Sequence, residues 1–288
     1  MRLIHDFLEG IIMKKIIALV LVAMMTATAF AGCASKPAES SSAPAGSSEA
    51  STGSSSDAAS SAAATTVEEG KLIMVTEAGF APYEYYDGQN VVGVDVDIAK
   101  EIAAAMGKEL VVKDIAFDSI IPEINAGKAD FGAAGMSITP ERLETVDFTI
   151  EYATSKQVVV VKKDNTAIKT PEDIKGKKVA VQLGTVADIV VSEDYPDCTL
   201  IQQKKYLAAA EDVKSGKADC IVMDALPAEE LVKENPELVI LEQELFTDKY
   251  GMAVKKGNAA LLEQINAVLQ KLMDEGKIAE FTLNHTSK

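Results

Sequence analysis

The segment AGMSITPER at residues 134–142 brings small residues, a hydroxyl group and a guanidinium together. Gly135 ends an expected strand, and its missing side chain lets a ligand approach the backbone closely. Arg142 falls in the first turn of an expected helix, where the helix dipole disfavours a cation. A guanidinium matches a carboxylate in bidentate geometry. Arg142 is therefore a candidate for binding a carboxylate, and Ser137 offers a hydroxyl and an amide beside it. The alternative is a local ion pair with Glu141, Glu144 or Asp147.

Two strand ends in the second half of the chain also carry residues that could bind a charged ligand group. Asp224 ends a buried apolar run, where its carboxylate is suited to an ammonium group or to capping the next helix. Gly184, Thr185 and Val186 lie between an expected strand and a helix. Backbone amides at a helix start attract anions, although Thr185 as an ordinary cap is the alternative.

Loops near strand ends supply one more acid and several aromatic rings. Glu77 ends the first expected strand and binds either a cation or its own loop. Three aromatic residues, Phe80, Tyr83 and Phe117, also lie in such loops. We assign Tyr83 to the core and keep open whether Phe80 and Phe117 pack on a ligand or in the core.

A short phrase occurs twice and relates these candidates to one another. Residues 124–135 read INAGKADFGAAG, and residues 213–224 read VKSGKADCIVMD. Each predicts a helix end, a capping glycine and a buried strand, with Gly135 and Asp224 at matching positions. Because functional groups gather at the carboxyl ends of parallel strands, both residues are expected to face one cleft between two lobes. Chance is the alternative, because helix–glycine–strand sequences are common.

The elements that must position these residues alternate between strand and helix. The pattern predicts a strand over 71–76 and a helix over 94–107 with Asp95 as its cap. Strands near 157–161 and near 250–254 are expected to join the two halves as a hinge. A single larger sheet without a cleft is the alternative.

The chain begins with segments that we expect to lie outside the fold. Met13 opens a basic and apolar signal peptide that ends at Cys33, and Met13 is our candidate for the true start. This ending resembles a bacterial lipobox, which implies lipidation of Cys33, although Phe30 replaces the usual leucine. An ordinary secretory signal is the alternative. Residues 34–66 are rich in serine and alanine and predict a flexible linker.

Charge and cysteine content narrow the function. The net charge of −16 argues against nucleic-acid binding, and no metal-ligand spacing or nucleophile–base pair appears. Besides Cys33, the chain has Cys198 and Cys220, for which the expected strand order gives a separation of about 9–10 Å. That exceeds the disulfide limit, so we predict two buried free thiols. No cofactor is expected.

Seven segments together resemble the family 3 extracellular solute-binding proteins, the amino-acid receptors of ABC importers. The segments read EAGFAPYEY, VGVDVDIAKEIA, FDSIIPEINAGKADFGAAGMSITPER, VDFTIEY, LGT, SGKADCIVMD and YGMAVKKGN, and the likeness covers residues 71–284. The resemblance implies an α/β, two-lobed periplasmic-binding-protein (Venus-flytrap) fold with two doubly wound sheets and a two-strand hinge. Lobe 1 is expected at residues 67–156 and 250–288, and lobe 2 at residues 157–249.

The resemblance also implies roles for individual residues at the amino-acid backbone of the ligand. Arg142 matches the arginine that clamps the α-carboxylate, helped by Ser137 and the amide of Val186, with Thr185 beside them. Asp224 matches the acid that holds the α-ammonium group. The carbonyl of Gly135 helps it.

The remaining roles concern the ligand side chain. Phe80 and Phe117 match the aromatic positions that sandwich it, and Glu77 falls where receptors for basic amino acids carry an acid. A polar or basic amino acid is therefore favoured. Two departures are that Gly135 replaces a frequent serine and Val186 a frequent threonine.

The implied partners are a free amino acid, an ABC transporter permease and, through the lipid anchor, the outer face of the cell membrane, on the periplasmic side in a two-membraned cell. The protein is expected to be an extracytoplasmic, monomeric, non-enzymatic receptor. A dehydratase-like enzyme on the same fold, with Glu77 as its acid, is one alternative. A sensor domain is another alternative, which would need a spanning helix and a signalling segment after residue 288.

Overall fold

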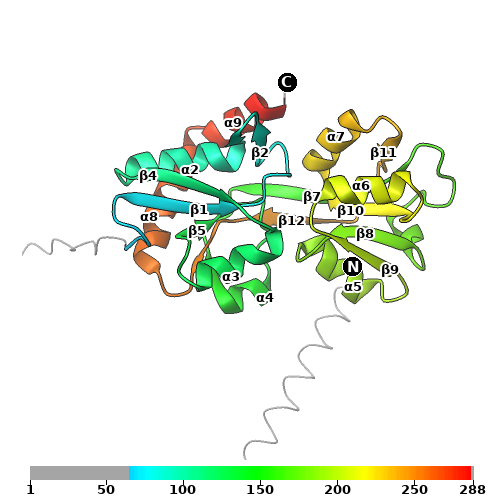
Figure 1. The fold of residues 1–288 in the computed structure, drawn as a ribbon, viewed down its shortest axis with the longest axis horizontal. Coiled ribbons are helices and arrows are strands. Elements are labelled where there is room, and N and C mark those ends of the chain that lie inside the picture. The colour runs from blue at the N-terminus through cyan, green and yellow to red at the C-terminus, as the bar shows by residue number, and fades with distance from the viewer. Residues whose placement is uncertain (1–64, 287–288) are drawn as a thin grey trace, which may run out of the picture. The chain divides into compact units, whose positions relative to one another are not determined.

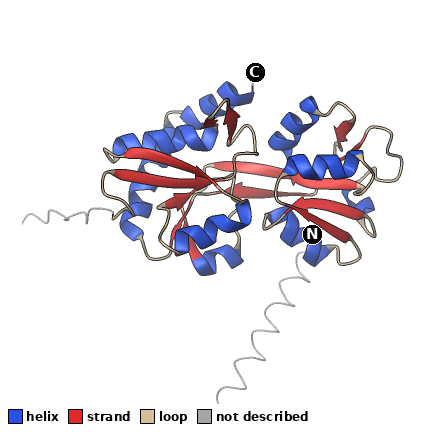
Figure 2. Cartoon of the chain, in the orientation of Figure 1, coloured by secondary structure: helices blue, strands red, loops and turns tan. Residues whose placement is uncertain are grey.

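A computed structural model describes residues 65–286, whose helices and strands are drawn in Figure 1 and Figure 2. The predicted signal peptide, Cys33 and nearly all of the predicted linker lie outside the described residues. Within residues 65–286, no helix is long and apolar enough to cross a membrane.

The first sheet has five strands and is mostly buried. In spatial order they are β4 (Glu109–Asp114), β1 (Lys71–Thr76), β5 (Phe131–Gly132), β13 (Ala253–Lys255) and β6 (Val146–Phe148). Strand β1 pairs in parallel with β4 and β5, whereas β13 runs antiparallel to β5 and β6. A small hairpin, β2 (Tyr85–Asp87) with β3 (Asn90–Val92), lies apart from this sheet.

Helices cover both faces of the first sheet because β1 is apolar on both sides. Leu72 and Met74 pack in one core cluster with α2 (Val94–Ala105) and α8 (Ala259–Asp274). Ile73 and Val75 pack in a second cluster with α3 (Ile120–Asn125). The same unit includes the 3₁₀ turn η1 (Phe117–Ser119), α4 (Pro140–Thr145) and α9 (Lys277–Thr286). Figure 1 shows α2 and α3 on opposite sides of this sheet.

The second sheet has its own core and its own helices. Its strand order is β11 (Leu238–Ile240), β7 (Ala153–Lys162), β10 (Cys220–Asp224), β8 (Lys178–Gln182) and β9 (Thr199–Gln203), with β12 (Phe246–Tyr250) also paired to β7. The helical segments are η2 (Pro171–Ile174), α5 (Val186–Asp194), α6 (Tyr206–Lys214) and α7 (Ala225–Glu234). We call the first sheet with its helices lobe 1 and the second lobe 2.

Two paired strands join the lobes. The chain passes from β6 of lobe 1 into β7, and it returns from β12 into β13 of lobe 1. Strands β7 and β12 run antiparallel, in register from Gln157–Phe246 to Ala153–Tyr250. Two sheets and a two-strand connection confirm the two-lobed α/β fold, and the alternative of one large sheet is wrong.

Two predictions about local structure need correction. The strand near 250–254 is two strands, because the chain changes sheets between Tyr250 and Ala253, where the Gly251 amide donates to the Met136 carbonyl (3.0 Å). Asp95 does not cap α2. Its cap residue is Gly93, and Asp95 is fully buried beneath the strand ends.

The two cysteines of the described part are free, with strand β8 between β9 and β10 as predicted. Only Cys220 is buried. Cys198 is partly exposed because it lies just before β9, where its thiol donates to the carbonyl of Ile174 (3.0 Å). The prediction of two buried thiols is therefore wrong for Cys198.

Candidate functional site

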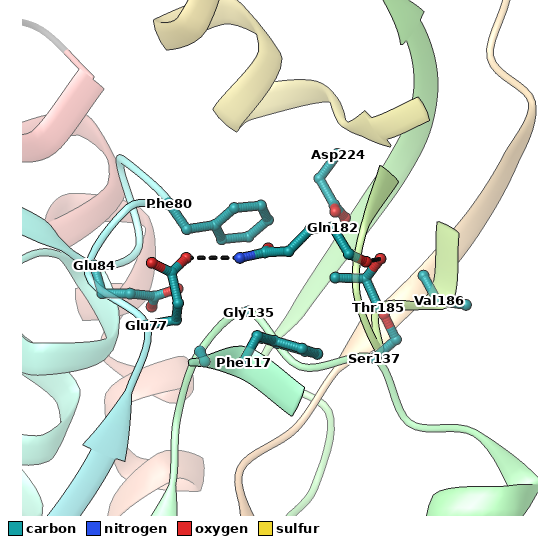
Figure 3. A pocket seen from close by; sticks show the side chains of 11 residues that line it. Glu77, Phe80, Glu84, Phe117, Gly135, Ser137, Gln182, Thr185, Val186 and Asp224 are labelled. Carbon is teal, nitrogen blue, oxygen red and sulfur yellow. Dashed lines mark hydrogen bonds between the residues drawn. The ribbon is translucent and has the colours of Figure 1, made fainter. Parts of the chain in front are cut away.

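A pocket of about 290 Å³ lies where strand ends of the two lobes meet (Figure 3). Eight of the nine predicted ligand-binding residues line it, and Arg142 is the exception. The eight are Glu77, Phe80, Phe117, Gly135, Ser137, Thr185, Val186 and Asp224. Three further lining residues were not predicted: Glu84, Ala134 and Gln182.

Arg142 lies directly behind this lining and holds a buried cation. It belongs to α4, whose cap Thr139 accepts a hydrogen bond from the Arg142 amide (3.2 Å). The guanidinium donates to the Ser137 carbonyl through Nη1 (2.6 Å) and, across the lobes, to the Gly184 carbonyl through Nη2 (2.8 Å). Its carbon Cζ lies 5.4 Å from the centre of the Phe117 ring. The residue is 6% exposed.

The charge of Arg142 is not balanced by a bound acid. Within residues 65–286 it forms no salt bridge, so the alternative of a local ion pair with Glu141, Glu144 or Asp147 is wrong. Burial lowers the pKa of Arg142 to about 10, and the group therefore stays cationic at neutral pH. Carbonyl oxygens carry only partial charges, so a buried guanidinium of this kind is suited to a carboxylate.

Ser137 connects the Arg142 region to the strand that returns to lobe 1. Its hydroxyl donates to a carboxylate oxygen of Asp248 in β12. Burial raises the pKa of Asp248, and the nearby Arg142 lowers it in part. Asp248 was not predicted, because only the pairing of β12 with β7 brings it to this position. Ser137 is thus held in place by an acid that lies close to a buried cation.

Asp224 is a second buried charged group of the pocket. Its Oδ1 accepts hydrogen bonds from Ser155 Oγ (2.7 Å), Gln157 Nε2 (2.6 Å) and the hydroxyl of Tyr250. Asp224 occupies the N-cap position of α7 as predicted, but its side chain makes no capping hydrogen bond there. Burial, with a smaller effect from Asp248, raises the pKa of Asp224 to about 6. A cation beside Asp224 would favour the charged form of its carboxylate and so lower this pKa.

The opening residues of α5 face the pocket between these two charges. Gly184 has a φ of +80°, and Thr185 caps α5 by accepting from the Asp188 amide (3.3 Å). The amide of Val186 is in the first turn, where an N–H has no partner inside the helix. The predicted cap by Thr185 is confirmed, and it coexists with an amide that is suited to an anion.

Gly135 is held in a conformation that only glycine adopts readily. Its φ is +50°. Its amide donates to Asp95 Oδ2 (2.9 Å), and the other carboxylate oxygen of Asp95 accepts from the Tyr152 hydroxyl (2.7 Å). A Cβ at Gly135 would lie 2.6 Å from Cε1 of Phe80. Asp95, which the sequence predicts as a helix cap, therefore fixes the backbone just after β5.

We expect Gly135→Ala to weaken ligand binding at least tenfold and to lower the unfolding free energy by about 1–3 kcal/mol. The strain of a positive φ and the displacement of Phe80 both act on the pocket wall. Calorimetry and urea unfolding measure the two effects. The control is Gly127→Ala, which has a similar φ of +70° but open space around its Cβ. Equal ligand affinities for the two variants would contradict a role of Gly135 in the pocket.

A second acidic group occupies the end of the pocket at β1. Glu77 is 1% exposed, and its Oε2 accepts from Gln182 Nε2 (2.9 Å), which also donates to the Lys204 carbonyl (2.8 Å). Figure 3 draws this contact between the rings of Phe80 and Phe117. Glu84 is fully buried, and neither of its carboxylate oxygens has a hydrogen-bond partner in residues 65–286. Burial, together with the nearby Asp95, raises the pKa of Glu84 well above its usual range.

The lining therefore has a strong excess of acid. Glu77, Glu84 and Asp224 line the pocket, and no lysine or arginine among the described residues does so. Gln182 was detectable in principle, because it is a polar residue that ends an apolar strand in the same way as Asp224. Glu84 follows no such pattern, since it lies in a loop before the β2–β3 hairpin.

Comparison with known proteins gives this geometry a context. Residues 72–286 match the family model of the bacterial extracellular solute-binding proteins, family 3. The ABC transporter arginine-binding protein 1 of Escherichia coli K12 is 33% identical over 212 residues, covering 72% of this chain and 86% of that protein.

Two solved structures are similar across nearly their whole length. The arginine-bound form of truncated ArgBP from T. maritima is 43% identical, has a TM-score of 0.68 and covers 70% of this chain and 96% of its own. An ancestral arginine-binding protein bound to glutamine is 38% identical, has a TM-score of 0.72 and covers 77% and 100%. The chain belongs to the bacterial extracellular solute-binding proteins, family 3.

Proposed function

We propose that this protein is an extracytoplasmic receptor that binds a free L-amino acid in the pocket and delivers it to the permease of an ABC transporter. The observation that carries the proposal is the pair of buried opposite charges: a guanidinium with only carbonyl partners and the Asp224 carboxylate. An amino acid is a zwitterion, so its carboxylate fits Arg142 and its ammonium group fits Asp224.

The remaining residues extend this proposal to the rest of the ligand. Ser137, Thr185 and the amide of Val186 support the carboxylate, and the carbonyl of Gly135 supports the ammonium group. Phe80 and Phe117 pack on the side chain. All of these residues line the pocket, as Asp224 does, and Arg142 lies behind its lining. This common position supports the proposal.

The acid excess of the pocket favours a basic side chain. Glu77 is a buried carboxylate, and a cationic ligand side chain stabilises its charged form. The names of the relatives agree with this choice, since the E. coli protein and the T. maritima protein are described by their binding of arginine. We therefore expect arginine, lysine or ornithine to bind more tightly than neutral amino acids.

The test is calorimetry with the twenty amino acids, ornithine and cystine, on the wild type and on Glu77→Gln. We expect tight binding of a basic amino acid, and about a tenfold loss of that affinity in Glu77→Gln with a smaller change for neutral ligands. Glu69→Gln, at an exposed site, controls for the change in net charge. The proposal fails if no amino acid binds.

The same experiment addresses the enzyme alternative. We expect the ligand recovered after long incubation to be chemically unchanged by chromatography, as for a receptor. The relatives described above are binding proteins, and nothing in them favours a dehydratase.

Rotation of lobe 2 against lobe 1 about the paired strands β7 and β12 is our proposal for how the ligand is enclosed. We place the limits of the lobes at residues 156/157 and 249/250. We further propose a monomer that is anchored to the outer face of the membrane by a lipid on Cys33. The lipobox-like sequence before Cys33 supports the anchor.

A further inference from the structure

Lys205 of lobe 2 forms an ion pair with Glu77, the acid that we assign to the ligand side chain. Lys205 is the residue before α6, and its Nζ lies 2.8 Å from Glu77 Oε1 at the end of β1 in lobe 1. The Glu77 side chain is 2% exposed, whereas that of Lys205 is 48% exposed. Nζ also lies 3.9 Å from an oxygen of Asp114.

Lys205 reaches Glu77 from outside the pocket. Glu77 and Gln182 line the pocket, and Lys205 is not among the lining residues. Glu77 therefore uses its two oxygens differently: Oε2 accepts from Gln182, which lines the pocket, and Oε1 faces a lysine at the solvent side. A ligand side chain inside the pocket therefore contacts a carboxylate that already forms an ion pair with Lys205.

We propose that Lys205 is a specificity-determining residue, which competes with the ligand side chain for Glu77 and so reduces the preference for cationic over neutral amino acids. This inference rests on the proposed function. The opposite charges of Glu77 and Lys205 nearly cancel at a distance, and a neutral polar side chain then loses little by lying beside Glu77. Without the lysine, the full charge of Glu77 acts on the ligand.

A purely structural role for Lys205 makes a different prediction. If its ion pair only held the lobes together, its loss would weaken the closed arrangement and reduce the affinity for every ligand by the same factor. A competitor changes the ratio of two affinities, because only the cationic ligand gains from its removal. The ratio of dissociation constants for L-glutamine and L-arginine therefore separates the two roles.

The experiment compares Lys205→Gln with Lys204→Gln by calorimetry at low ionic strength. Lys204 is adjacent and exposed, its side chain forms no hydrogen bond or ion pair with the described residues, and its substitution changes the net charge equally. We expect the glutamine-to-arginine ratio to rise about fivefold in Lys205→Gln and to stay unchanged in Lys204→Gln. Because the ion pair is half-exposed, the variant is expected to fold normally.

A double variant tests whether the effect passes through Glu77. In a Glu77→Gln background, Lys205→Gln is expected to leave the ratio unchanged, since the shared carboxylate is gone. Equal losses for both ligands, or an unchanged ratio in the single variant, would overturn the inference and leave the proposed function standing. Failure of the wild type to bind any amino acid would overturn both.

Discussion

Replacing Arg142 by alanine is expected to weaken amino-acid binding by about 3–5 kcal/mol, the largest effect of any single substitution in the pocket. The guanidinium is 6% exposed and its own hydrogen-bond partners are carbonyl oxygens, so a ligand carboxylate supplies the directly bonded counter-charge that these partners lack. Without Arg142, that carboxylate is buried beside Ser137 and the α5 amides with no cation. Calorimetry with the tightest-binding amino acid measures the loss.

Arg142→Lys is the matched variant for this prediction. It retains the charge but not the planar fork that donates to Ser137 and Gly184 at the same time, so an intermediate affinity is expected. Circular dichroism and thermal unfolding establish that both variants are folded. Near-normal affinity of folded Arg142→Ala would show that the carboxylate binds elsewhere.

The second large effect is expected for Asp224→Asn, at about 2–5 kcal/mol of binding free energy. Three donors converge on Asp224 Oδ1, from Ser155, Gln157 and Tyr250, and hold the carboxylate at the pocket wall. Asparagine is similar in shape but has no charge for the ligand ammonium group. Its amide nitrogen also adds a donor where the ligand supplies donors already.

The pH dependence of binding provides an independent check on Asp224. Its pKa is raised to about 6 in the described structure, so the group is charged above that pH and becomes neutral below it. The wild-type affinity is therefore expected to fall as the pH drops from 7 to 5, while Asp224→Asn loses this part of the dependence. Parallel pH profiles for the two proteins would contradict the assignment, and Tyr250→Phe tests the support that Asp224 receives.

Much of the pocket was predictable because its residues lie at the carboxyl ends of buried strands. Asp224 ends β10 and Gly135 follows β5, and apolar runs followed by small or polar residues predict such positions from the sequence alone. The capping pattern of Thr139 and Pro140 likewise predicts where α4 begins and hence where Arg142 lies. The family resemblance added the chemical roles.

Other residues were not predictable because their positions depend on contacts between distant segments. Asp95 has the sequence signature of a helix cap, yet burial under the strand ends makes it the acceptor for the Gly135 amide. Asp248 reaches Ser137 only through the pairing of β12 with β7. Lys205 meets Glu77 only because the lobes face each other.

The hinge illustrates the same limit at the level of secondary structure. Residues 250–254 have the apolar composition of one strand, but Tyr250 pairs with Ala153 in the second sheet and Ala253 pairs with Gly132 in the first. A single sequence cannot indicate a change of sheet within three residues, since both strands need the same kind of side chain. Gly251, whose added Cβ would lie 2.9 Å from Ile138, is the local sign of it.

The measurement that tests the central claim most directly is a crystal structure of the complex with L-arginine. We expect the α-carboxylate within about 3 Å of the Arg142 guanidinium and the α-ammonium group within about 3 Å of the Asp224 carboxylate, with the ligand held between the two lobes. An amino acid bound at another place, or a complex in which both side chains turn away from the ligand, would contradict it.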